Sequence, residues 1–370
     1  MSDRITLIHS SMPPLEEYVA EIRPLWESLM LTNNGGMHRE LEIQLAAYLG
    51  VENLSLFVNG HSALQLAIEA MALKGEIITT PFTFGSTTHA IVRNGLTPVF
   101  CDVRKDDCNI DADLIESLIT ERTSAILPVH IYGNACDVAK IGEIAERRGL
   151  KLIYDAAQAF GVSVDGKGIG TYGDASVFSF NATKSFHTIE GGAVASKDGA
   201  LKATLTKLAN YGKNLSVEYG MELVGVNGKM NEFQAAMGLC NLRHIDGELA
   251  KRTAADRKYR TRLEKIEGIR LIPSVDSTAR NHTYFPIIVE EEMYGKTRDD
   301  VADMLLKENI TSKKYFTPLT PDFICYGKRF GELELPVARH AAERVLALPM
   351  HACLSDDDID RVCGVIEGGR

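Results

Sequence analysis

The sequence lacks the signatures of metal sites, disulfide frameworks and nucleic-acid-binding surfaces. Its seven cysteines are scattered, odd in number and form no Cys-x-x-Cys pair, which argues against zinc or a disulfide framework and favours the reducing cytoplasm. A net charge of -10 and the lack of a dense lysine and arginine cluster argue against nucleic acid as a partner. Anionic small molecules are still compatible with this charge, because backbone amides bind phosphate even in an acidic protein.

Long apolar runs are also missing. The longest, such as residues 123–131, fall far short of the roughly 20 residues that a membrane span requires. The first residues, Met-Ser-Asp-Arg-Ile, contain no basic segment followed by an apolar one, so no secretory signal is visible. We therefore expect a cytoplasmic protein with no membrane partner.

Short strand-like runs alternate with helical patterns from about residue 50 to residue 200. The expected strands are 54–58, 77–80, 98–103, 124–130 and 150–154, and apolar residues recur at helical spacing over 63–71 and 138–148. Strands separated by helices of this length predict an α/β fold with a mostly parallel sheet covered on both faces. Ligands bind such sheets at the carboxyl ends of the strands, so residues that directly follow the strands are the first candidates for a site.

The length of 370 residues favours two domains over a single core. We expect a large domain over residues 1–245, which includes the N-terminal segment, and a smaller C-terminal α/β domain over residues 246–370. A long helical stretch from 231 to about 266 is expected to join them in place of a flexible linker.

A lysine and an aspartate each follow a predicted strand. Lys184 comes after a β-rich run over 175–180, and its neighbours are Ser, Thr, Phe and Gly rather than charged residues. An amine held inside such a site has its charged form disfavoured and can attack a carbonyl near neutral pH. Asp155 ends an apolar strand, where a buried carboxylate can keep a ring nitrogen protonated. Taken alone, a solvated surface lysine and a helix N-cap are the plainer explanations of these two residues.

An anion cradle and an aromatic residue follow two other strands. Gly60 permits close backbone approach at the start of a helix, where the free amides of His61 and Ser62 would point at an anion. Phe84 follows the strand at 77–80, and its ring could stack on a flat cofactor or simply pack in the core. The order of cradle, aromatic residue, aspartate and lysine on successive strand ends is much less expected by chance than any one of them.

With these segments in place, the sequence resembles the DegT/DnrJ/StrS family of sugar aminotransferases, which use pyridoxal 5′-phosphate (PLP) and have the fold-type I architecture. The resemblance covers nearly the whole chain and includes the stretches Leu31-Thr-Asn-Asn-Gly35, Pro128-Val-His-Ile-Tyr-Gly133 and Gly225-Val-Asn-Gly-Lys-Met-Asn-Glu232. It implies that Lys184 is the Schiff-base lysine, that Asp155 pairs with the pyridine nitrogen and that Phe84 stacks on the ring. No metal is expected.

The resemblance also implies how the cofactor phosphate and ring oxygen are held. Ser179 and the amides of His61 and Ser62, next to Gly60, would bind the phosphate, and Gln158 would touch the ring oxygen or the phosphate. Asn227 would reach the phosphate of the other subunit's cofactor, so the resemblance implies a homodimer with shared active sites.

Three positions depart from the usual pattern of the family. His61 stands where the family usually has threonine, which preserves the backbone amides. Lys229 stands where it usually has arginine, and Thr320 follows Tyr315-Phe-Thr-Pro318 where a histidine is usual. These differences concern substrate binding rather than cofactor chemistry.

Within the family, the chain looks most like the 4-amino-4,6-dideoxyglucose type. Such enzymes act on dTDP-4-keto-6-deoxyglucose with glutamate as amino donor, and Asn33, His187 and Tyr315 are the candidate substrate contacts. The alternatives are a 3-amino or other nucleotide keto-sugar aminotransferase of the family, and a non-catalytic regulator that binds PLP or sugar. A dehydratase of the same fold is disfavoured, because the family's dehydratases have histidine where Lys184 stands.

Overall fold

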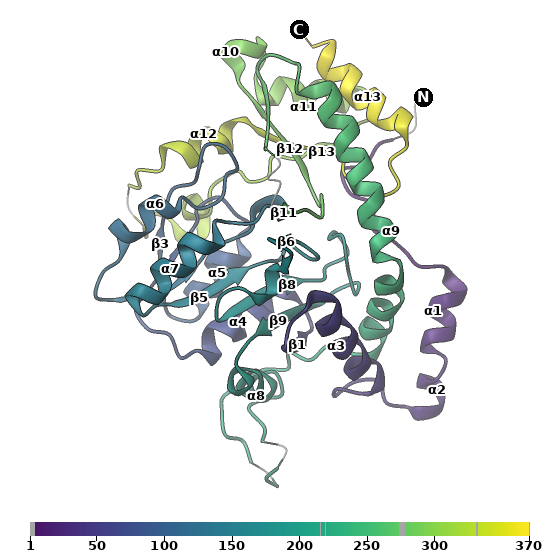
Figure 1. Cartoon of the computed structure of the whole chain (residues 1–370), viewed down its shortest axis with the longest axis vertical. Helices are drawn as coiled ribbons and strands as arrows, with labels where there is room; N and C mark the ends of the chain where they lie inside the picture. Colours follow the sequence, from purple (N-terminus) through teal and green to yellow (C-terminus); the bar gives the residue numbers. More distant parts are fainter. Residues whose placement is uncertain (1–3, 215, 219, 274–277, 331, 370) are drawn as a thin grey trace.

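A seven-stranded sheet forms the centre of the computed structural model, which describes residues 4–214, 216–218, 220–273, 278–330 and 332–369 (Figure 1). The strand order is β1-β9-β8-β5-β4-β2-β3, and only β9 among these seven runs antiparallel to its neighbours. The strands are β1 (Asn53–Phe57), β2 (Glu76–Thr79), β3 (Thr97–Phe100), β4 (Thr123–Leu127), β5 (Lys151–Asp155), β8 (Ala175–Ser179) and β9 (Gly192–Ser196). The predicted mostly parallel sheet is confirmed.

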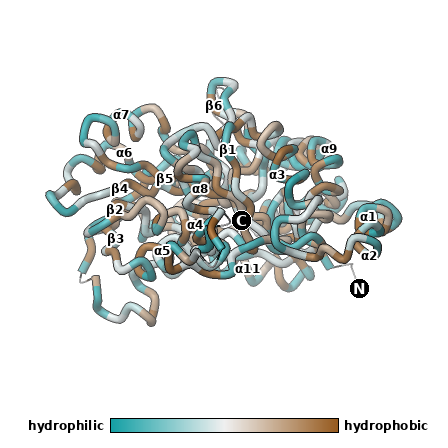
Figure 2. The backbone as a smooth tube through the Cα atoms, turned by 90° about the horizontal axis from the view of Figure 1, so that it is seen from below, coloured by the Kyte–Doolittle hydropathy of each residue, from teal (hydrophilic) through white to brown (hydrophobic). Residues whose placement is uncertain are grey.

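Helices cover both faces of this sheet because side chains along each strand alternate between two apolar clusters. Ile126 of β4 packs on one side with α3, α6, α7 and the first part of α9, whereas Ala125 and Leu127 pack on the other side with α4, α5 and α8. The helices are α3 (Gly36–Leu49), α4 (Gly60–Ala70), α5 (Ser86–Arg93), α6 (Ala112–Ile115), α7 (Val138–Arg148) and α8 (Gly199–Leu208). Hydrophobic colours concentrate along β2, β4 and β5 in the interior (Figure 2).

Helix α9 (Glu232–Leu263) leads from the large sheet to a second, smaller sheet. It begins at a capping box formed by Asn231 and Gln234, and it confirms the helix predicted over 231–266. The small sheet consists of β10 (Ile269–Leu271), β12 (Phe285–Val289) and β13 (Val345–Leu348), and it packs against α9, α11 (Arg298–Lys307) and α13 (Asp356–Glu367). The predicted boundary at 245/246 falls within the continuous helix α9 and stays a prediction.

Short elements connect these layers. A short hairpin over residues 163–168 pairs with a strand that returns from the small sheet. The short elements are α1 (Leu15–Ile22), α2 (Leu25–Ser28), α10 (Glu291–Tyr294), α12 (Pro336–Arg344), β6 (Ser163–Val164), β7 (Lys167–Gly168), β11 (Thr278–Ala279), η1 (Glu116–Leu118), η2 (Ile131–Gly133), η3 (Ile169–Thr171), η4 (Thr320–Asp322) and η5 (Ile324–Tyr326).

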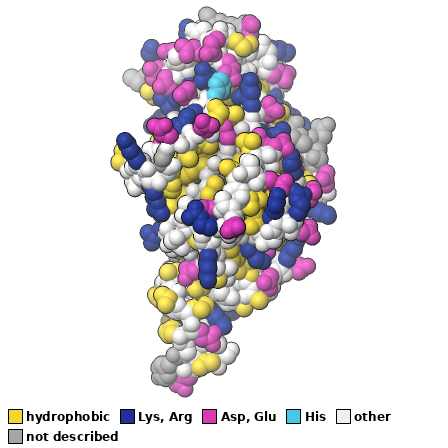
Figure 3. Space-filling model, turned by 90° about the vertical axis from the view of Figure 1, so that its left-hand side faces the viewer, with side chains coloured by type: hydrophobic (Ala, Val, Ile, Leu, Met, Phe, Trp, Pro, Cys, Tyr) yellow, Lys and Arg dark blue, Asp and Glu magenta, His cyan; other side chains and the backbone are white. Residues whose placement is uncertain are grey.

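Two parts of the chain project from the body and carry exposed apolar side chains. Helices α1 and α2 stand beside α9, and the described residues of the segment 211–226, which we call the arm, extend beyond α8 (Figure 1). Figure 3 shows hydrophobic side chains along the arm. Among the described residues, the helices are too short or too polar for any of them to span a membrane.

Candidate active site

The carboxyl ends of β1, β2, β5 and β8 bring the predicted site residues to one edge of the large sheet. These four strands run parallel, because β1 and β8 are both antiparallel to the intervening β9. Gly60 follows β1, Phe84 follows β2, Asp155 ends β5, and Ser179 and Lys184 lie at and after the end of β8. The sheet therefore gathers residues from four separate segments where α/β folds bind their ligands.

A tight loop after β8 presents Lys184 to an aromatic cluster. The loop is held by main-chain hydrogen bonds, from the Lys184 amide to the Asn181 carbonyl (2.9 Å) and from the Ala182 amide to the Ile189 carbonyl (2.7 Å). The Lys184 ammonium donates to the Tyr284 hydroxyl (3.3 Å) and lies 5.7 Å from the centre of that ring. Tyr284 was not anticipated from the sequence.

Tyr315 completes this cluster on the side of the small sheet. Its ring meets the ring of Tyr284 edge-on, with the ring centres 5.7 Å apart, and its carbonyl accepts a hydrogen bond from the Tyr132 hydroxyl. The predicted substrate contact Tyr315 thus lies one aromatic ring away from Lys184. Its contact with substrate stays a prediction.

Asp155 is buried and has no cationic hydrogen-bond partner among the described residues. Its carboxylate accepts one hydrogen bond from the Thr87 hydroxyl (2.8 Å) and another from the Ala157 amide (3.1 Å). Burial raises the pKa of Asp155, and the hydrogen bonds from Thr87 and Ala157 together with the charge of Lys184 offset this only in part. The carboxylate is therefore ready to accept a hydrogen bond from a cationic N–H group.

The start of helix α4 lies directly against Ser179. A Cβ atom at Gly60 would come within 2.7 Å of the Ser179 Cβ and 3.0 Å of its hydroxyl oxygen, so only glycine fits there. The helix N-terminus and the Ser179 hydroxyl consequently lie side by side, an arrangement that suits a phosphate. The His61 ring is bound to the Ser86 hydroxyl (2.9 Å).

One detail of the cradle corrects the prediction. The Ser62 amide is not free, because it donates to the side-chain oxygen of Asn59 (2.8 Å), which caps helix α4. The expectation of a free amide at Ser62 is therefore wrong, whereas the contact of Ser62 with a phosphate stays a prediction. The His61 amide and the Ser62 hydroxyl are the groups of this turn that can still contact a phosphate.

Comparison with known proteins identifies the family. Residues 15–367 match the DegT/DnrJ/EryC1/StrS aminotransferase family. The chain belongs to this family. It is 43% identical over 367 residues to dTDP-4-amino-4,6-dideoxy-D-glucose transaminase from Shigella dysenteriae, with 99% of each chain covered. It is 41% identical over 374 residues to the transaminase of the same name from Escherichia coli, with 100% of each chain covered.

The fold agrees with that relationship. The structure of DesI with its TDP-sugar product superposes with a TM-score of 0.94 at 34% identity, covering 99% of this chain and 93% of DesI. This confirms the predicted aminotransferase fold and the assignment of the chain as an enzyme. Aminotransferases of the family depend on PLP, which confirms the predicted cofactor.

The residues of this aminotransferase fit PLP. The buried Asp155 offers a carboxylate for a protonated ring nitrogen, and the helix N-terminus at Gly60 lies beside the Ser179 hydroxyl, so both can donate to a phosphate. The Phe84 side chain is 66% exposed, so its ring is accessible to a planar ligand rather than packed in the core. Gln158 is buried and its side-chain oxygen accepts from the Tyr132 amide (2.8 Å), which leaves its NH2 group as the end that could reach a ligand.

The two other predicted substrate contacts in this aminotransferase are Asn33 and His187. Asn33 is exposed in a turn with a positive φ of 63°. His187 is buried, with its Nε2 2.5 Å from the Ser11 carbonyl and its Nδ1 accepting from the Ile189 amide (3.1 Å). With both ring nitrogens occupied, the geometry favours a role for His187 in holding the loop around Lys184, and its contact with substrate gains no support.

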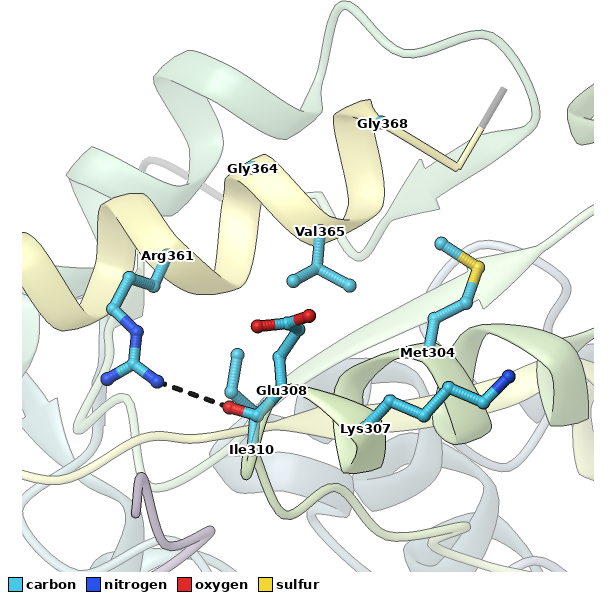
Figure 4. Close-up of a pocket in the computed structure, with 8 residues that line it drawn as sticks. All are labelled: Met304, Lys307, Glu308, Ile310, Arg361, Gly364, Val365 and Gly368. Carbon is cyan, nitrogen blue, oxygen red and sulfur yellow. Dashed lines mark hydrogen bonds between the residues drawn. The ribbon is translucent and has the colours of Figure 1, made fainter. Parts of the chain in front are cut away.

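A shallow hollow on the small-sheet side is unrelated to these residues. It measures about 460 Å³ and lies between α11 and α13, lined among others by Met304, Glu308, Arg361 and Val365 (Figure 4). The Arg361 guanidinium points to the Glu308 carbonyl across it (3.2 Å). None of the predicted site residues lines this hollow.

Proposed function

We propose that this aminotransferase transfers the amino group of glutamate to the keto carbon of dTDP-4-keto-6-deoxyglucose. The product is the 4-amino-4,6-dideoxy sugar nucleotide. The reaction type is supported above all by one observation. The Lys184 amine and the buried Asp155, which has no cationic hydrogen-bond partner among the described residues, lie at the same edge of the sheet. The choice of sugar is supported by 43% and 41% identity, over full length, to two transaminases named for this product.

In the proposed site, each residue has a separate task toward the cofactor. Ser179 and the turn at Gly60 and His61 would hold the phosphate, and Phe84 would cover the ring. When bound, PLP supplies an electron sink for the charge that remains on the donor's α-carbon after deprotonation. Asp155 would keep the ring nitrogen protonated, because a buried carboxylate strongly favours a cationic partner.

Lys184 is the proposed proton carrier. It would first act as a general base and remove the proton from the α-carbon of the donor. It would then act as a general acid and deliver that proton in the next step. The Tyr284 hydroxyl, 3.3 Å from the Lys184 nitrogen, would hold the amine in place while it is free. The rings of Tyr284, Tyr315 and Tyr132 would form a wall beside the half-buried amine and limit its contact with bulk water.

We also propose that the protein is a homodimer with shared sites. Exposed apolar side chains lie on α1–α2, such as Trp26 (67%) and Leu29 (77%), and on the arm, such as Val224 (91%). Apolar surface of this extent is typical of surfaces that associate. Asn227, exposed where the arm rejoins the body, would reach the partner's cofactor phosphate.

Glutamate added to the PLP-loaded protein is expected to remove the visible absorbance band and produce the spectrum of the pyridoxamine form. Keto-sugar nucleotides would then restore the original band, and mass spectrometry with NMR of the product would show which carbon carries nitrogen. The dTDP-4-keto-6-deoxy sugar is expected to react fastest. No spectral change with any amino donor would favour the regulator, and amination at C3 would refute the sugar assignment but not the reaction type.

The arm is expected to be needed for dimerisation. Val224→Asp should raise the dimer dissociation constant about 100-fold or more, because a two-fold interface would bury the new charge twice. Light scattering across a dilution series measures this. Met293→Asp, which also replaces an exposed apolar residue but on α10, serves as control and should remain dimeric. Equal masses for the two variants would contradict the proposed interface.

A further inference from the structure

Lys229 ties together the two ends of the arm. Its ammonium donates to the side-chain oxygens of Asn210 (2.8 Å) and Asn227 (2.9 Å), which flank the arm on either side. It also lies 5.0 Å from the centre of the Tyr211 ring. Three main-chain hydrogen bonds already close the arm at this point: Tyr211 amide to Val226 carbonyl (3.0 Å), Gly228 amide to Ala209 carbonyl (2.9 Å) and Val226 amide to Leu208 carbonyl (2.8 Å).

The main chain around Asn227 is therefore fixed without help from Lys229. The Gly228 carbonyl accepts from the Val58 amide (2.7 Å), and Val58 lies between strand β1 and the cradle at Gly60. The arm thus rejoins the body next to the phosphate-binding turn. What the backbone leaves open is the orientation of the Asn227 carboxamide, whose two ends have opposite hydrogen-bonding character.

An ammonium group determines that orientation. A lysine ammonium has three donors and no acceptor, so both asparagines must turn their oxygens toward it. The NH2 group of Asn227 is then directed away from Lys229, and because Asn227 is exposed this group is accessible to a ligand. If the carboxamide flipped, its NH2 group would face the ammonium. The hydrogen bond would then be lost, and the partly positive NH2 hydrogens would be repelled by the ammonium charge.

We propose that Lys229 is a positioning residue that presents the donor end of Asn227 to a phosphate and does not itself bind the sugar nucleotide. The inference rests on the proposed role of Asn227 at the partner's cofactor. Two of the three ammonium donors are taken by asparagine oxygens and the Tyr211 ring covers one side, so the group is committed within its own subunit.

A double-mutant cycle on cofactor affinity tests this directly. The dissociation constants of pyridoxamine 5′-phosphate and of pyridoxamine, which lacks the phosphate, are measured by calorimetry for the dimeric protein and its variants. Asn227→Ala should weaken binding of the phosphorylated ligand about 10-fold, the value of one hydrogen bond to a charged group. Lys229→Met should weaken it about 3- to 10-fold through the misoriented amide.

The combined variant distinguishes positioning from direct binding. If Lys229 acts through Asn227, Lys229→Met in the Asn227→Ala background has no further effect, and pyridoxamine binding is unchanged throughout. Lys229→Arg should restore most of the affinity, because arginine also offers only donors. Lys213→Met removes an exposed lysine of the same arm and is the matched control, with no change expected.

Four results would overturn the proposal: additive effects of the two substitutions, equal loss with pyridoxamine, unchanged affinity in Lys229→Met, or loss of the dimer in Lys229→Met by light scattering. Unchanged affinity in Asn227→Ala would remove the role of Asn227 and the inference with it. That result would leave the transamination reaction intact, because the glutamate-driven spectral change tests the reaction separately.

Discussion

Lys184→Ala is expected to lower turnover at least about 1000-fold, because it removes the amine that is proposed to carry the proton. The ammonium of Lys184 is the cation that faces the Tyr284 hydroxyl at the sheet edge. Alanine removes both the group that would attack the cofactor aldehyde and the base that would deprotonate the donor. Single-turnover kinetics with glutamate, followed by absorbance, measures the loss without interference from product release.

The same variant should still bind cofactor, which separates chemistry from folding. The phosphate cradle at Gly60 and Ser179 and the carboxylate of Asp155 are unchanged, so the affinity for pyridoxamine 5′-phosphate should remain within about threefold. Borohydride reduction of the PLP-loaded wild type, followed by peptide mapping, should label position 184 alone. A label on another lysine, or turnover near the wild-type rate in Lys184→Ala, would remove Lys184 from the mechanism.

The positions of Lys184 and Asp155 could be predicted from the sequence because the signals are local. Each β-rich run of apolar residues reports its own strand, and in a parallel sheet the strand ends must lie together. The order of the segments along the chain was therefore enough to expect the cradle, Phe84, Asp155 and Lys184 at one edge. The long helix α9 was equally visible, since residues 231–266 are rich in Ala, Leu, Lys and Arg, which all favour helices.

The contacts that tune these groups could not be predicted in this way. Tyr284 lies 100 positions from Lys184 and reaches it only because the chain returns from the small sheet to the β6–β7 hairpin. Thr87 is 68 positions from Asp155 and comes to it through the packing of α5. No periodic pattern encodes such pairs, because they depend on the tertiary arrangement of separate elements.

The Asn59 cap, in contrast, has a signal in the sequence, although it was not predicted. Asparagine three residues before Ser62, at the start of an apolar helical pattern, is a common N-cap signal. One amide at the start of helix α4, that of Ser62, is thus occupied by the cap of the same helix. The buried state of His187 was not readable, because its environment is built by Ser11 and by Asn241, 54 positions away.

Asp155→Asn should lower the catalytic rate, while the stability of the cofactor-free protein should stay equal or increase. Asparagine keeps the shape of the side chain and can still accept from the Ala157 amide, but it is neutral and cannot form an ion-paired hydrogen bond to a protonated ring nitrogen. The loss of that bond should lower the rate of the glutamate half-reaction about 10- to 100-fold. A rate within twofold of the wild type would show that Asp155 does not keep the nitrogen protonated.

Without cofactor, the same variant should unfold at an equal or higher temperature than the wild type at neutral pH. Burial raises the pKa of Asp155 above its value in the unfolded chain, so the folded protein holds this proton more tightly. Above the raised pKa the ionised carboxylate therefore opposes folding, and this penalty disappears as the pH falls through the raised value. The difference in melting temperature between variant and wild type should be largest near neutral pH and should shrink in acid.

Adding pyridoxamine 5′-phosphate should reverse the order of the two proteins. In the wild type the ring nitrogen of the ligand supplies the cation that Asp155 lacks, so binding stabilises the wild type more than Asp155→Asn. Melting curves with and without ligand, recorded over a pH series, measure both effects on the same samples. If the cofactor-free variant is less stable than the wild type at neutral pH, the expectation is wrong. Asp155 would then stabilise the fold through its hydrogen bonds with Thr87 and Ala157 even without a cation.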